Sequence, residues 1–296
     1  MCYLCFINVC VSHFTTVDVL INVGVCTLVN VIVVIGHCTI VGILIDVGHC
    51  TSVDIVVCIV RCSCARVDIT VCHIASVYII ICIDTGTIVG ILVNISHCTI
   101  LIIRICTCAN VVIVVGICAG TSTDIVVVIG HCTTVDIVVG VNCGTGICIL
   151  INVSQRARLN IVISVDVGTC TGICIVVVIS HCASVNIIIL INVGACTCAG
   201  IDIIIVISHC TSIDVIVGIN CGTCTSAGVD IIIVISHCAT VNVIVVKRLC
   251  TTINVSIVIV VGVGYCPAHN IVIVIVVGHC ATANVVIVVG VGCTAS

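Results

Sequence analysis

The sequence contains no glutamate and no tryptophan, and its only methionine, glutamine and lysine are Met1, Gln155 and Lys247. In the standard genetic code these are the five residue types whose codons all end in a purine. All three stop codons end in a purine as well. A DNA repeat with a pyrimidine at every third base is therefore open in this frame without any selection on the protein. This pattern predicts a product of repetitive DNA, read antisense or out of frame, with no specific biochemical function.

Charged and aromatic residues are also scarce, at 6% and 2% of the chain. Ordinary soluble domains are about 25% charged. The formal net charge is −4 and the basic residues are scattered, so we expect no nucleic-acid partner. The single proline is Pro267, and no linker-like stretch divides the chain. We therefore interpret residues 1–296 as one low-complexity region of Val/Ile/Cys-rich repeats, with no second domain.

Valine and isoleucine dominate instead, in short runs such as Ile203–Ile207 and Ile231–Ile235. Side chains branched at Cβ favour a pleated strand over a helix. The runs do not alternate polar with apolar residues, so as strands they should need burial on both faces. We predict an all-β fold, either β-solenoid-like or built of stacked β-repeats. The alternative is a disordered or aggregating chain, because these runs match the signature of aggregation-prone segments, and self-association is expected.

Internal repeats support the solenoid interpretation. The repeat unit reads Ser/Gly-His-Cys-Thr/Ala-Thr/Ser-Val-Asp/Asn, followed by a Val/Ile run. Late in the chain it recurs with a 28-residue period, at His181, His209 and His237, and with a 14-residue submultiple. Near the start a 12-residue period links Cys26, Cys38, Cys50 and Cys62. Units of these three lengths suit stacked coils, and they also suit slippage of a DNA repeat.

Cysteine is the one abundant reactive residue, with 31 copies. The nearest approach to a zinc motif is Cys221-Gly-Thr-Cys224 with His237, but no second spaced ligand pair follows, and a tetrahedral site needs four donors. We therefore expect no dedicated metal site and no cofactor. The recurring His-Cys dipeptide places its side chains on opposite faces of a strand, so we expect no cysteine–histidine dyad and no enzyme. A thiol-rich metal binder remains an alternative.

The mean hydropathy of +1.61 raises the question of a membrane. Asn, His, Ser and Thr interrupt the apolar runs, whereas a spanning helix needs about 20 predominantly apolar residues. The apolar runs allow the chain to associate with a membrane through its surface hydrophobicity. The runner-up function is accordingly a cysteine-rich structural β-repeat protein, at the cell surface or on a membrane. The sequence assigns no compartment.

Overall fold

The computed structural model describes residues 2–72, 74–95, 100–118, 122–142, 146–154, 156–167, 172–194, 199–221, 224–249, 251–262, 268–277 and 283–291. These residues form one sheet of 15 strands. The strands are β1 (Cys2–Val23), β2 (Cys26–Val47), β3 (Cys50–Val71), β4 (Ile74–Ile95), β5 (Ile100–Ile117), β6 (Ser122–Asn142), β7 (Gly146–Val153), β8 (Arg156–Val167), β9 (Gly172–Ile179), β10 (Cys182–Val193), β11 (Ala199–Cys221), β12 (Cys224–Leu249), β13 (Thr251–Gly262), β14 (Ala268–Val277) and β15 (Ala283–Val291). The described part of the chain includes no helix of a length and hydropathy that would span a membrane.

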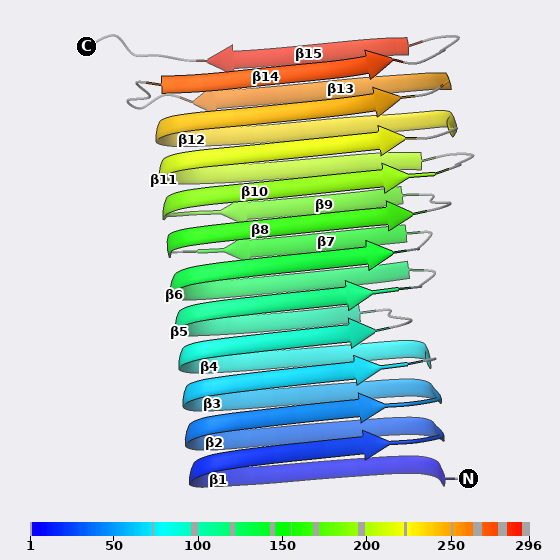
Figure 1. Cartoon of the computed structure of the whole chain (residues 1–296), viewed down its shortest axis with the longest axis vertical. Coiled ribbons are helices and arrows are strands. Elements are labelled where there is room, and N and C mark those ends of the chain that lie inside the picture. Colours follow the sequence, from blue (N-terminus) through cyan, green and yellow to red (C-terminus); the bar gives the residue numbers. More distant parts are fainter. Residues whose placement is uncertain are drawn as a thin grey trace.

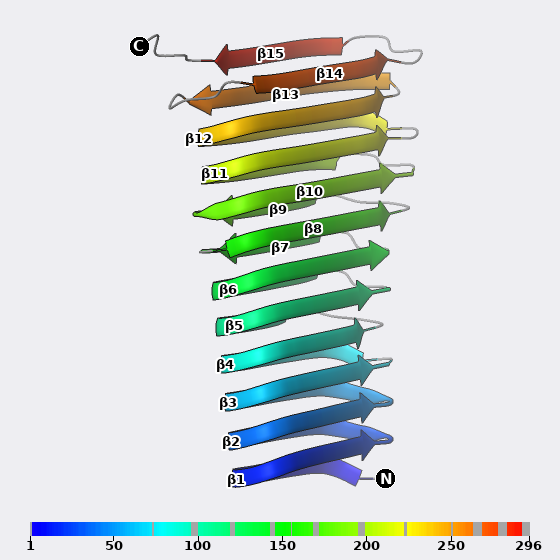
Figure 2. The ribbon, with the colours of Figure 1, turned by 60° about the vertical axis from the view of Figure 1, so that its left-hand side comes forward.

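The strands wind into a β-solenoid, so the predicted all-β stacked-repeat fold is confirmed. Every strand pairing is parallel. A long strand such as β2 runs along one face, bends round a corner and returns along the other face (Figure 1). Later turns divide the same path in two, as β7 and β8 do. Turned by 60°, the molecule keeps its ladder of nearly horizontal strands, with β1 at one end and β15 at the other (Figure 2).

The repeat periods of the sequence are whole and half turns of the solenoid. Cys26 pairs with Cys50 and Cys38 with Cys62, so the 12-residue period carries the chain from one face to the other. A turn is 24 residues long where Asn110 faces Thr134. It lengthens to 26 and then 28 residues further along the chain. The turn length therefore changes while equivalent positions stay in register.

The core is built from columns of valine and isoleucine, one residue per turn. Val29, Val53 and Val77 occupy one column and are almost completely buried. Along each strand burial alternates, as in β9, where every second residue is buried and the others are half-buried. The expectation that the strands are buried on both faces is thus met on one face only. The inner side chains fill the space between the two faces, while the outer ones, although also Val and Ile, remain partly in solvent.

Glycine leaves room for the preceding turn at two positions of the corner. A Cβ added to Gly36 would lie 2.5 Å from the backbone oxygen of Ser12 in the preceding turn. At Gly130 the same clash would involve the backbone oxygen of Cys106. These glycines precede His37 and His131, and they allow the backbone of the corner to pack directly on the turn before it.

Candidate functional site

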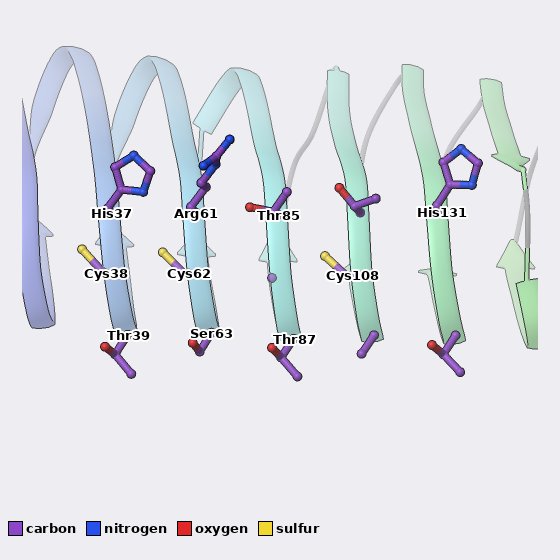
Figure 3. Close-up of a pocket in the computed structure, with 14 residues that line it drawn as sticks. His37, Cys38, Thr39, Arg61, Cys62, Ser63, Thr85, Thr87, Cys108 and His131 are labelled. Carbon is purple, nitrogen blue, oxygen red and sulfur yellow. The ribbon is translucent and has the colours of Figure 1, made fainter.

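A groove follows the corner between the two faces (Figure 3). It has a volume of about 830 Å³ and is open to solvent along its length. Three rows of side chains from successive turns line it. The first row is His37, Arg61, Thr85, Thr107 and His131; the second is Cys38, Cys62 and Cys108; the third is Thr39, Ser63, Thr87 and Thr133.

The His-Cys repeat has a structural explanation at this corner. His37 and Arg61 are exposed, whereas Cys62 is buried and Cys38 is half-buried. In Figure 3 the ring of His37 and the sulfur of Cys38 point in opposite directions. The cysteine row closes the end of the hydrophobic core, a role that suits a small apolar side chain. The ring of His37 faces water and the sulfur of Cys38 points the other way, so these two neighbours do not form a nucleophile–base pair.

Histidines of successive turns contact one another along the exposed row. The rings of His13 and His37 lie 5.0 Å apart with a tilt of 56°. The rings of His181 and His209 stack at 4.8 Å with an interplanar angle of 10°. Both distances are close to the roughly 4.8 Å between neighbouring strands. The contacts therefore follow from the in-register stacking of the repeat.

Polar ladders run along the outer face of the later turns. The Nδ2 of Asn160 donates to Oδ1 of Asp136 at 2.8 Å, and the Nδ2 of Asn242 donates to Oδ1 of Asp214 at 2.8 Å. In each of these pairs the amide of one turn donates to the carboxylate of the turn before it. These ladders satisfy the outward polar side chains between turns, and they account for the recurring Asp/Asn of the repeat unit.

Cysteines also stack in pairs, one full turn apart. Cys62 contacts Cys38 at the corner, and burial, followed by the neighbouring Cys38, raises the pKa of the Cys62 thiol to about 11. On the outer face, Cys82 contacts Cys58, and burial and then Cys58 raise the pKa of Cys82. All four side chains are free thiols. The sequence analysis did not identify these pairs, although reading positions one full turn apart as neighbours would have found them.

The zinc-like candidates from the sequence fall largely outside the described part. The side chains of Cys221, Cys224 and His237 are not among the described residues. Their backbone positions are described: Cys221 ends β11, Cys224 begins β12, and His237 lies in the middle of that 26-residue strand. Among the residues that the structure describes, no three His, Cys or Asp side chains converge on one point that could hold a metal ion.

The geometry therefore offers rows of like side chains instead of a convergent constellation. Comparison of the chain with protein-family models, with curated proteins and with solved structures finds no match. No relative thus supplies a function.

Proposed function

We propose that the chain has no specific biochemical activity and that, where it is made, it acts as a structural β-repeat that associates side by side with further copies of itself. The observation that supports this proposal is the apolar outer surface of both faces. Leu92, Val138 and Leu190 point outward with 43%, 41% and 47% of their surface exposed. A soluble monomer rarely leaves contiguous apolar surface of this kind in water.

The outward residues are aligned in columns. On one face the outward column from β2 to β13 is apolar at every turn: Ile32, Val56, Ile80, Ile102, Val126, Leu150, Val176, Ile204, Ile232 and Val258. Ile32 and Ile232 are exposed and the other side chains of the column are half-buried. A column of identical shape on a second copy can interdigitate with it, as facing sheets do at a separation of about 10 Å. A second copy is thus the occupant that such a regular surface fits.

The available area supports association between copies. At roughly 4.8 Å per turn, the stacked strands from β2 to β12 span on the order of 40 Å, and the eight residues of β7 extend across roughly 26 Å. One face thus offers on the order of 1,000 Å², compared with roughly 800 Å² per partner in a stable interface.

The test is the oligomeric state as a function of concentration, measured by sedimentation velocity. We expect the parent chain to form multimers and the double variant Ile80→Lys/Ile204→Lys, which places charge in the outward apolar column, to shift towards monomer. Thr87→Lys, which adds the same type of charge at the exposed corner, is the matched control and should associate like the parent. Equal association of the column variant and the parent would refute the proposal, provided circular dichroism shows that both are folded.

The origin of the chain is a separate proposal. We infer from the near absence of residues with purine-ending codons that the reading frame arises from repetitive DNA. Strand-specific ribosome profiling of the locus tests this inference. Footprints on the opposite strand or in another frame would support it. Three-nucleotide periodicity in this frame would show that the chain is synthesised, and a strongly purine-ending third codon position in the nucleotide sequence would overturn the inference.

A further inference from the structure

The outer face of the early turns carries an arrangement that neither the groove nor the apolar columns use. Cys58 of β3, Cys82 of β4 and Arg104 of β5 occupy one outward column in consecutive turns. Both cysteines are half-buried and Arg104 is exposed. The thiols contact each other, and the guanidinium is close enough to Cys82 to favour its thiolate.

From this column we infer a binding site for one soft monovalent metal ion, Cu(I) or its analogue Ag(I), held in line between the sulfurs of Cys58 and Cys82. Soft thiolate ligands select Cu(I) among biological metals. Cys106 of β5 also acts electrostatically on Cys82, but among the described residues no three His, Cys or Asp side chains converge on one point, which disfavours a tetrahedral zinc site. The remaining class of metal ion is one that two thiolate ligands are enough to coordinate.

The strand spacing fits such an ion. A metal–thiolate bond is about 2.3 Å long, so two bonds in line separate the sulfurs by roughly 4.6 Å. Neighbouring strands are roughly 4.8 Å apart, and in-register side chains are parallel, so the Cβ atoms are separated by a similar distance. A disulfide needs Cβ atoms about 3.8 Å apart and would therefore require the backbone to move. The in-register pair suits a bridging ion better than it suits a disulfide.

Charge distinguishes this pair from a second one. On binding, each thiol loses its proton, two protons leave for every ion bound, and the resulting dithiolate complex of a monovalent ion carries one negative charge. Arg104 is one turn from Cys82 and stabilises that charge. Cys148 and Cys174 form a similar pair in contact, but Asp124 and Asp202 flank it in the same column. The two pairs share their sulfur geometry and differ in the sign of the neighbouring charge.

Competition titration of the reduced, full-length chain with Cu(I) and a chromogenic Cu(I) chelator tests the inference. We expect Cys58→Ser, Cys82→Ser and the double variant each to lose the same single tight site, because both thiols are needed for one ion. Cys64→Ser is the matched control. Cys64 lies between Ile40 and Ile88 in register, so this variant should keep the tight copper site. X-ray absorption of the bound copper should show two sulfur neighbours.

Two further variants test the role of charge. Arg104→Gln should keep the number of ions and weaken the tight site roughly tenfold, which corresponds to about 1.4 kcal/mol. Arg158→Gln, at an exposed position in another column, should leave the affinity unchanged. The inference is overturned if the Cys58 and Cys82 variants lose no more copper than Cys64→Ser, or if absorption shows three or four sulfur ligands per ion. Sedimentation velocity of the same samples shows whether a variant has also lost self-association, so a loss of copper binding and a loss of self-association can be told apart.

Discussion

The imidazole ring of His181 lies flat on that of His209 one turn later, with their centroids 4.8 Å apart. His209 has a φ of 47°, in the left-handed region that costs a residue with a Cβ more than it costs glycine. His209 therefore takes part in the ring stack and also has the unfavourable backbone conformation.

Substitutions at the two histidines should separate these contributions. His181→Ala removes only the stack and should lower the free energy of unfolding by about 1 kcal/mol. His209→Gly removes the same stack but relieves the backbone, so its cost should be smaller by roughly 1 kcal/mol. Urea unfolding of both variants measures the difference. If His209→Gly proves the more damaging of the two, the backbone of His209 is not strained.

The corner glycines should tolerate no side chain. Gly130→Ala brings a Cβ against the backbone oxygen of Cys106, and we expect a loss of about 1–3 kcal/mol in the free energy of unfolding. At Gly90 an added Cβ meets nothing within 4 Å, so Gly90→Ala should be neutral or stabilising by a few tenths of a kcal/mol. Thermal unfolding followed by circular dichroism compares the two. Equal effects would show that close packing at the corner is unimportant.

Lys247 is fully buried in an inner column, in register with Ile219 and Ile275. A charged group in an apolar interior is costly. Lys247→Met keeps an unbranched side chain, one atom shorter and without the amino group, and it should raise the free energy of unfolding by on the order of 2 kcal/mol. Arg158→Met, at an exposed position, should change it by less than about 0.5 kcal/mol. A destabilised Lys247→Met variant in urea unfolding would mean that the ammonium group is well solvated in the fold.

Stability should fall in alkaline solution because of Cys62. Burial raises the pKa of its thiol from 9.0 to about 11, so between these pH values the unfolded chain loses a proton that the folded chain keeps. The free energy of unfolding is unaffected below pH 9 and should decline by on the order of 2 kcal/mol as the pH rises to about 11. Urea unfolding of the parent and of Cys62→Ala at pH 8 to 11 measures this slope. Cys62→Ala should make the slope shallower but not flat, because the raised pKa values of Cys82 and Cys148 still contribute. Cys64→Ala should keep the slope of the parent, and an unchanged slope in Cys62→Ala would contradict the assignment.

The β class and the stacked repeats could be predicted, because β-branched residues and a regular repeat spacing do not depend on how the turns are arranged. The direction in which each side chain points could not be predicted. Inward Val31 and outward Ile32 are of the same chemical type, so hydrophobic periodicity could not reveal which face is buried. The sequence marks the outside in two places: at the corner, where exposed His131 alternates with half-buried Cys132, and at the outward Asp and Asn of the ladders, such as Asp136 and Asn160.

The candidate sites depended on register, which short motifs do not contain. Cys221 and Cys224 drew attention because zinc motifs are local in sequence. Cys58 and Cys82 become neighbours only when the chain has completed a whole turn. A search for cysteines that are one full turn apart in the sequence, instead of at the spacing of a zinc motif, would find this pair.

The lengthening of the turns from 24 to 26 and 28 residues proceeds by even numbers. Successive side chains of a strand alternate between the two sides of the sheet, so a single extra residue would exchange core and surface for the rest of that face. Two extra residues leave the alternation intact. In genetic terms, a two-codon insertion within a strand widens the coil and leaves its interior unchanged. A one-codon insertion within a strand exchanges core and surface unless a bulge absorbs it, as the register shift between Cys224 and Ala227 against β13 does.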